Sequence, residues 1–206
     1  LREQGYPESL IALVERNPET KDFVLDYPKY KGLEEIDISK DVMKGEIPHF
    51  LQWDERWGYE TYGSDFLAVT GCGPTCLSMV TCGLTGDTQW NPYEVAKMAE
   101  DNGYYVDGSG SSWALMSSGA EKLGLTVSSV IFDAEHIRAT LEAGQPIICV
   151  MGPGDFTNAG HFLVLTGVDK NGDIILQDPN SVKRTKQHWD VQKLMNQMKN
   201  LWAYSC

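Results

Sequence analysis

The sequence lacks any hydrophobic run long enough to cross a bilayer. Its longest apolar stretches, residues 146–151 and 162–165, fall far short of the ~20 residues that a membrane helix needs. Positive charge is also scarce, with 17 lysines and arginines against 29 aspartates and glutamates and a formal net charge of −12. Because phosphate binding needs a basic surface, we expect neither nucleic acid nor an anionic membrane surface as a partner.

Cysteine is sparse and odd in number. Five cysteines in 206 residues are too few for a small domain held by disulfides, and at least one thiol stays free unless it pairs with another chain. Cys72, Cys76 and Cys82 fit none of the usual zinc spacings with a histidine. A phosphate-binding loop, a His-Glu-x-x-His zinc helix and a complete Gly-x-Gly-x-x-Gly fingerprint are also absent. We therefore expect no metal and no cofactor.

What is present is the composition of a globular protein, with 42% hydrophobic and 22% charged residues. We predict an N-terminal helical arm and connector over residues 1–45 and one main domain over residues 46–206. In the arm, Pro7 opens a helical pattern that Asn17-Pro18 ends. We interpret the arm as packing on the main core, with gating of the site as the alternative. Because the chain begins at Leu1 rather than Met, we expect a fragment or a processed form.

The main domain separates early helices from late strands. Helical spacing and stop signals predict helices at residues 73–84, 91–103, 112–123 and 133–143. Runs rich in β-branched and aromatic residues predict strands at residues 126–132, 146–151, 161–168, 174–177 and 201–204. Residues 169–173, DKNGD, carry the strongest hairpin signal in the chain. Helices first and an antiparallel sheet second predict an α+β fold.

Cys72 is the candidate nucleophile. It lies in residues 71–75, GCGPT, where Pro74 places it at the N-terminus of a predicted helix. Unpaired backbone N–H groups and the helix dipole stabilise a thiolate there, and the same N–H groups are placed to receive an oxyanion. Gly71 and Gly73 leave room for a substrate carbonyl. The alternative is an inert, buried cysteine at a tight turn.

A nucleophilic thiolate needs a base, and His161 is the best candidate among four histidines. It begins a predicted strand, where an unpaired imidazole would be out of place. We interpret His49, His136 and His188 as surface residues, because they lie in a connector, a charged helix and a basic loop. A strand-borne histidine and a helix-borne cysteine form a pair if the helix packs on the sheet.

Asp178 and Asn180 are the candidates for orienting the imidazole. A two-residue turn at Asn171-Gly172 would place Asp178 opposite Leu165, on the same face as His161 but about 13 Å along the strand at ~3.4 Å per residue. That is too far for contact. A wider loop or a bulge would shift the register so that either residue reaches the histidine, and both alternatives stay open.

Four segments in this order resemble a known family over residues 47–181: QWDERWG at 52–58, GCGPT at 71–75, GHFLV at 160–164 with Gly167, and Asp178-Pro179. The chain resembles bacterial C39-like cysteine peptidases of the papain-like superfamily. The resemblance implies a papain-like fold in which Cys72 is the nucleophile, His161 the general base and Asp178 its orienting partner. It also implies Gln52 as an oxyanion-hole donor, a role that suits a neutral amide N–H. It favours Asp178 over Asn180, although papain itself uses an asparagine.

The predicted activity is hydrolysis of peptide or amide bonds, with a peptide or protein as the partner. Trp113, Gly160 and Asn180 are candidate substrate-binding residues in or beside glycine-rich loops, although Trp113 would equally suit the core. Free-standing members of the family are often exported or anchored to the bacterial surface, which implies that location here. The alternative function is a non-catalytic module that binds peptides or cell-wall fragments. A redox or metal role for the cysteines is the third hypothesis.

Overall fold

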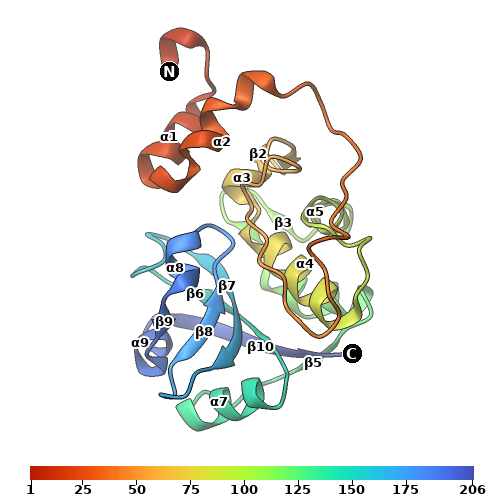
Figure 1. The fold of residues 1–206 in the computed structure, drawn as a ribbon, viewed down its shortest axis with the longest axis vertical. Coiled ribbons are helices and arrows are strands. Elements are labelled where there is room, and N and C mark those ends of the chain that lie inside the picture. Colours follow the sequence, from red (N-terminus) through yellow and green to blue (C-terminus); the bar gives the residue numbers. More distant parts are fainter.

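A six-stranded antiparallel sheet runs through the main part of the molecule, as the computed structural model of residues 1–206 shows (Figure 1). The strand order is β5-β10-β6-β7-β8-β9. The strands are β5 (Thr126–Ser128), β6 (Ile147–Met151), β7 (His161–Val168), β8 (Ile174–Gln177), β9 (His188–Trp189) and β10 (Met198–Ser205). Most helices precede this sheet along the chain, which confirms the predicted α+β class.

The central strands β6 and β7 are buried on both faces, and alternate residues enter different cores. Ile148 and Val150 pack in the core that contains α4 (Cys72–Thr85) and α5 (Pro92–Asp101). Ile147 and Cys149 pack in a second core with α7 (Ala134–Glu142) and α9 (Val191–Met195). In Figure 1, α4 and α5 lie to the right of the sheet and α9 to its left. Because each face is covered, these strands read as continuous apolar runs rather than as alternating ones.

Helix α4 crosses the middle of the larger core. All residues from Gly73 to Gly83 are buried, because small and apolar side chains occupy every side of this segment. Pro74 stands in its first turn, and Gly86 ends it in the left-handed conformation at φ 76°. The packing of α4 against β7 therefore sets the N-terminus of this helix, with Cys72, at one end of the sheet.

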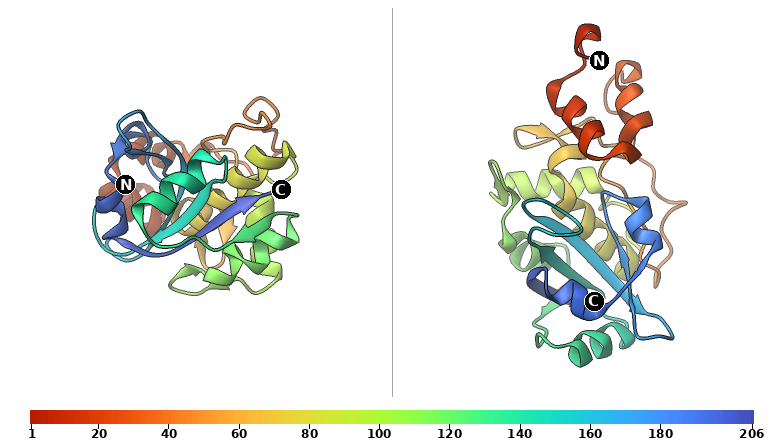
Figure 2. Two further views of the ribbon diagram at one scale, coloured as in Figure 1. Left: turned by 90° about the horizontal axis from the view of Figure 1, so that it is seen from below. Right: turned by 90° about the vertical axis from the view of Figure 1, so that its left-hand side faces the viewer.

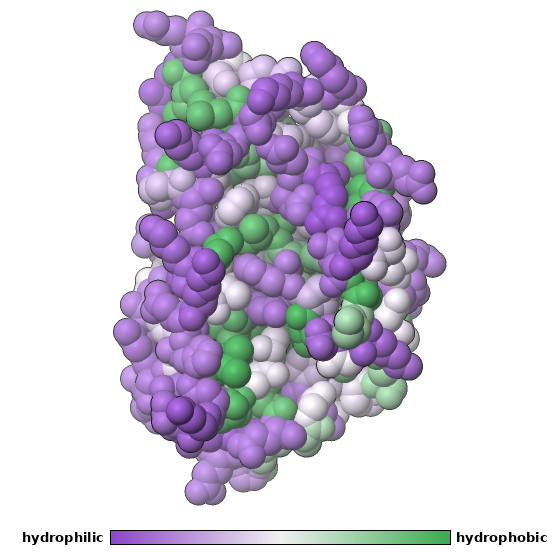
Figure 3. All heavy atoms as spheres, in the orientation of Figure 1, coloured by the Kyte–Doolittle hydropathy of each residue, from purple (hydrophilic) through white to green (hydrophobic).

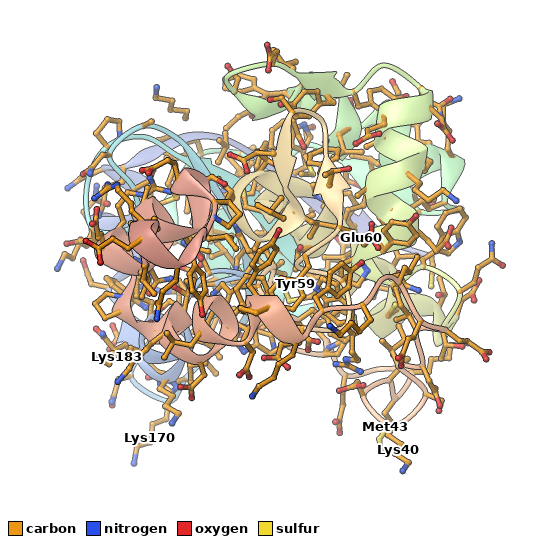
Figure 4. The ribbon with its side chains drawn as sticks, turned by 90° about the horizontal axis from the view of Figure 1, so that it is seen from above. Lys40, Met43, Tyr59, Glu60, Lys170 and Lys183 are labelled. Atoms are coloured by element: carbon orange, nitrogen blue, oxygen red, sulfur yellow. The ribbon has the colours of Figure 1, made fainter.

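The N-terminal arm packs as a separate layer on the main part. It contains α1 (Glu8–Arg16), α2 (Lys21–Leu25) and the short helices η1 (Arg2–Gln4), η2 (Pro18–Thr20) and η3 (Tyr27–Lys29). The Phe23 and Tyr59 rings stack at 4.2 Å, and the Tyr59 hydroxyl donates to the Phe23 carbonyl. Figure 4 looks onto the arm and shows Tyr59 beside its helices, and Figure 2 shows the arm at one end of the molecule. The division at residue 45 stays a prediction.

Several predicted elements have different bounds. The predicted helix 112–123 is split into η4 (Trp113–Met116) and α6 (Ser118–Lys122). The Tyr204 hydroxyl donates to the Met116 carbonyl at 2.7 Å, and Ser117 between the two pieces adopts a non-helical conformation. The predicted strand 126–132 ends at Ser128, and the last strand is longer than predicted. The sequence analysis missed these short elements: β1 (Thr61–Tyr62), β2 (Asp65–Phe66), α3 (Leu67–Thr70), β3 (Tyr105–Val106), β4 (Gly110–Ser111), α8 (Val182–Lys186), α9 and β9.

The surface is mostly hydrophilic, with apolar residues in small separate patches on the face that Figure 3 shows. No helix combines the length and the apolarity that crossing a membrane requires.

Candidate active site

Cys72 is the first residue of α4, and the two glycines beside it are required by close packing. A Cβ at Gly73 would lie 2.6 Å from the Ser111 hydroxyl oxygen, which itself contacts the Tyr62 hydroxyl at 2.6 Å. A Cβ at Gly71 would lie 2.5 Å from the Leu67 carbonyl oxygen. Any side chain at these positions would displace the turn that carries the sulfur.

The His161 ring lies between Cys72 and Asp178. Its Nε2 atom is 2.7 Å from the Asp178 Oδ1 atom, and the ring lies near enough to the Cys72 sulfur to lower the pKa of that thiol. Because Nε2 faces the carboxylate, Nδ1 is the atom that remains for the sulfur. His161 is the first residue of β7 and is only 6% exposed, so these contacts are shielded from water. The three side chains form one continuous line.

These contacts change how the thiol and the imidazole ionise. Burial alone would raise the pKa of Cys72, but the neighbouring His161 with its charge outweighs it and lowers this pKa below its ordinary value. Burial would lower the pKa of His161, but the charge and hydrogen bond of Asp178 raise it above its usual range. Both shifts favour a thiolate beside an imidazolium. By contrast, burial raises the pKa of Cys76, Cys82 and Cys149.

Asp178 is fully buried and is held from several directions. The Arg184 Nε atom donates to its Oδ2 at 2.6 Å, and the Asn180 backbone N–H donates to its Oδ1 at 2.7 Å. The Asp178 backbone N–H donates to the Thr185 hydroxyl at 2.9 Å. Burial would raise the pKa of Asp178, but the charges of His161 and Arg184 lower it, so the carboxylate stays ionised.

The register of the β7–β8 hairpin explains how Asp178 reaches the histidine. The pairs Val168 with Ile174 and Gly167 with Ile175 enclose a loop wider than a two-residue turn, and a bulge follows between Leu165 and Gly167. The next pairs put Val164 opposite Gln177. One more step along the ladder brings Asp178 level with residue 163, two positions from His161 instead of four.

Asn180 does not contact the imidazole in this structure. Its backbone N–H donates to Asp178, and its carbonyl accepts from the Trp53 indole N–H at 3.2 Å. Of the two alternatives that the sequence left open, the structure therefore places Asp178 against His161.

Gln52 is buried beside the cysteine. Its backbone N–H donates to the Pro179 carbonyl at 2.7 Å, and its side-chain amide donates to the Ala68 carbonyl at 2.8 Å. The amide oxygen has no hydrogen-bond partner. An amide group carries two N–H donors, of which one pairs with Ala68, and Gln52 lines a cavity that Cys72 also lines.

Two cavities meet at Cys72 and His161. The larger, of about 800 Å³, is also lined by Trp113, and the smaller, of about 450 Å³, is also lined by Gln52 and Asn180. Gly160 lines both cavities. Trp113 is 46% exposed and packs edge-on against Trp202, so it is not the core residue that the alternative required. The candidate substrate-binding residues thus lie around the sulfur.

Comparison with known proteins identifies the family. The model of the family described as "Peptidase_C39 like family" matches residues 44–205. The chain belongs to the C39-like peptidase family. This membership, together with the helix-first architecture and antiparallel sheet, confirms the papain-like fold that the resemblance implied. A search of curated proteins found no match.

Two solved structures are similar to this C39-like protein. One is the peptidase domain of Streptococcus ComA, a bifunctional ABC transporter involved in a quorum-sensing pathway, with 20% identity over 66% of this chain and 91% of that chain and a TM-score of 0.48. The other is from Bacillus anthracis and is described as a C39-like peptidase, with 17% identity over 80% of this chain and 97% of that chain and a TM-score of 0.43.

The structure of this C39-like protein also adds residues that the sequence analysis missed. His49 was predicted to be a surface residue, but it is only partly exposed, and its Nε2 contacts the Asp178 carbonyl at 2.7 Å. Burial lowers the pKa of His49, although Asp178 acts against this. His136 and His188 are exposed, as predicted, and each pairs with an aspartate on the surface. The proline before His49 marked it as a connector residue, and no local signal pointed to its distant partner.

Proposed function

We propose that this C39-like protein is a cysteine peptidase or thiol amide hydrolase. In this proposal Cys72 is the nucleophile, His161 the general acid and base, and Asp178 the group that orients the imidazole. The observation that supports it most strongly is the buried His161–Asp178 pair beside Cys72, at the point where two cavities meet. A nucleophile, a base within hydrogen-bond reach and a third group that orients the base are the features of nucleophilic catalysis.

In the first half of the reaction, the Cys72 thiolate attacks the carbonyl carbon of the scissile bond. A sulfur–carbon bond forms, and the carbonyl electron pair moves onto the oxygen. The second N–H of the Gln52 amide and the backbone N–H groups at the start of α4 are the donors proposed for this oxyanion. The carbon–nitrogen bond then breaks, and His161 donates its proton to the leaving amine.

In the second half, water attacks the thioester. His161, now neutral, takes a proton from the water, and the sulfur leaves as the new carbon–oxygen bond forms. The products are a carboxylic acid and the regenerated thiolate beside an imidazolium. An amine in place of water would transfer the acyl group through the same residues.

The substrate in this proposal is an extended peptide that lies across both cavities. Trp113 offers an exposed aromatic face at the larger cavity, and Asn180 offers a polar side chain at the smaller one. Gly160 lets the substrate backbone approach close to His161, because it has no side chain that would stand between them.

A peptide-library cleavage assay tests the proposal. The wild type, Cys72→Ala and Cys206→Ala are incubated with a mixture of peptides, and products are identified by mass spectrometry. Cys206 is exposed at the C-terminus and serves as the matched control. We expect the wild type and Cys206→Ala to give the same cleavage products and Cys72→Ala to give none, with unchanged circular dichroism. Cleavage by Cys72→Ala at the wild-type rate would refute the proposal, and no cleavage by any variant would favour a binding module.

A further inference from the structure

The N-terminal arm reaches across to the segment that follows Asp178. The Glu19 carboxylate accepts three hydrogen bonds there: from the Ser181 hydroxyl at 2.5 Å, from the Val182 N–H at 2.8 Å and from the Lys183 N–H at 3.3 Å. The arm lies above α8 in Figure 1, and Figure 4 shows Lys183 at the edge of the arm helices. Residues more than 160 positions apart in the chain are thus joined at the start of α8.

A second contact from the arm lies one residue nearer to the site. The Asn17 side-chain amide donates to the Asn180 carbonyl at 2.8 Å, and its contact with the Asn180 side-chain oxygen is 3.2 Å. Asn17 also lines the smaller cavity beside Cys72. The two arm residues therefore hold the loop between β8 and α8 along its length.

Helix α8 has only five residues, so it depends on such contacts. A helix this short is marginal by itself, and the N–H groups of its first turn have no partners within it. Glu19 supplies an acceptor and a negative charge at this end, and both stabilise a helix N-terminus. Ser181 adds a local cap by accepting from the Arg184 N–H at 3.0 Å.

The residues that hold Asp178 lie on this same helix. Arg184 pairs with the Asp178 carboxylate, and Thr185 accepts from its backbone N–H. The contacts therefore run from Glu19 through the first turn of α8 to Arg184 and Thr185, and from there to the carboxylate that faces His161.

We propose that Glu19 is a positioning residue of the active site, and that the N-terminal arm fixes the carboxylate of Asp178 by completing α8. This inference rests on the proposed function, because it concerns the same line of contacts. Loss of the Glu19 contacts would let α8 fray and let Asp178 move away from His161. His161 would then bind its proton less tightly, and the Cys72 thiolate would lose its stabilising charge.

The reactivity of Cys72 across pH tests this inference in the full chain. Brief, substoichiometric labelling with iodoacetamide, followed by peptide mapping, gives the thiolate pKa of Cys72 in the wild type and in each variant. Glu19→Ala removes the acceptor, whereas Glu19→Gln removes the charge but keeps an acceptor oxygen. Glu15→Gln removes a charge from an exposed position on α1 and is the matched control. The other charged groups near the line of contacts, Arg16, His49 and Arg184, are unchanged in all three variants.

If Glu19 positions Asp178, Glu19→Ala raises the thiolate pKa by about one unit, and labelling at acidic pH falls about tenfold. Glu19→Gln should restore most of the wild-type behaviour, and Glu15→Gln should match the wild type. An equal shift in Glu19→Ala and in the control Glu15→Gln would assign the effect to loss of surface charge alone and overturn the inference, as would a wild-type profile in Glu19→Ala.

Asn17→Ala and the comparison of Cys72 with Cys206 in the wild type complete the test. If circular dichroism shows that Glu19→Ala does not fold, Asn17→Ala decides, because it removes a contact to the same loop without changing any charge. A raised thiolate pKa in Asn17→Ala supports positioning by the arm, and an unchanged one overturns it. A wild-type Cys72 that reacts no faster than Cys206 contradicts the proposed function itself. A reactive Cys72 whose thiolate pKa is unchanged in Glu19→Ala overturns only this inference.

Discussion

The Nε2 atom of His161 lies 2.7 Å from the Oδ1 atom of Asp178, and the whole carboxylate is buried. This contact keeps a charged imidazole beside Cys72, because it raises the pKa of His161 against the opposing effect of burial. It also explains why the pKa of the cysteine is lowered although its surroundings are desolvated.

The first prediction is a broad, bell-shaped dependence of kcat/KM on pH. Activity should rise as Cys72 ionises and fall as His161 loses its proton. Since the first pKa is lowered and the second raised, the acidic limb should lie below about 8.5 and the alkaline limb above about 6.5, the ordinary values of the two side chains. Asp178→Asn removes the charge that raises the pKa of His161, so the alkaline limb should move to lower pH and narrow the profile. An unchanged profile in Asp178→Asn would show that the carboxylate does not set these ionisations.

Gln52→Ala should lower kcat without changing the reactivity of the thiol. Removing one donor from an oxyanion hole costs about 10²- to 10³-fold in kcat, whereas attack on iodoacetamide forms no oxyanion. Steady-state kinetics and labelling of the same variant separate the two effects. If Gln52→Ala retains wild-type kcat, its amide is a structural group that only pairs with Ala68.

His49 should stabilise the folded protein through the Asp178 carbonyl. His49→Ala removes one of the two donors to this buried carbonyl and leaves the Ser181 N–H, which costs about 0.5–1.5 kcal/mol in the free energy of unfolding. His136→Ala, at an exposed position, is the control. Urea unfolding at neutral pH measures both. An equal, small effect of the two substitutions would show that the Asp178 carbonyl does not depend on His49.

His49 should also make the folded protein less stable in acid. Burial lowers the pKa of His49, so below about 6.5 the unfolded state takes up its proton first and stability falls as the pH falls. His49→Gln removes this contribution, and the difference in unfolding free energy between wild type and variant should shrink from pH 7 toward pH 5. A difference that is constant over this range would contradict the assigned direction.

Trp113→Ala should weaken substrate binding and leave the thiol unchanged. The side chain is 46% exposed at the larger cavity and carries no titratable group. We expect KM to rise while the thiolate pKa of Cys72 stays at its wild-type value. Ile131→Ala, at another exposed apolar position outside both cavities, is the control. Unchanged KM in Trp113→Ala would remove this residue from the binding surface.

Local patterns were sufficient for the α+β class and for the helix that begins at Cys72. The apolar runs of β6 and β7 and the Gly-Cys-Gly-Pro turn are determined by neighbouring residues, so the sequence predicts them well. The partner of His161 could not be chosen in this way. It depends on the width of one hairpin loop and on a bulge after Leu165, and each changes the register by one residue.

The contacts that support Asp178 were harder still to predict from the sequence. His49 and Glu19 lie more than 120 residues before this segment and reach it only after the sheet and the arm have packed, whereas Arg184 follows Asp178 by six residues on α8. None of them stands in a motif. The split of the predicted helix 112–123 has a similar origin, because the Tyr204 hydroxyl that contacts Met116 comes from the last strand.

The central claim is that Cys72 is a thiolate activated by His161, and labelling with iodoacetamide between pH 5 and 9 tests it most directly. Peptide mapping ranks all five cysteines in the wild type and in His161→Ala. We predict selective labelling of Cys72 with a pKa well below about 8.5, a loss of this selectivity in His161→Ala, and little reaction at the buried Cys76, Cys82 and Cys149. A Cys72 that reacts no faster than Cys206, or that reacts equally in His161→Ala, would contradict the account.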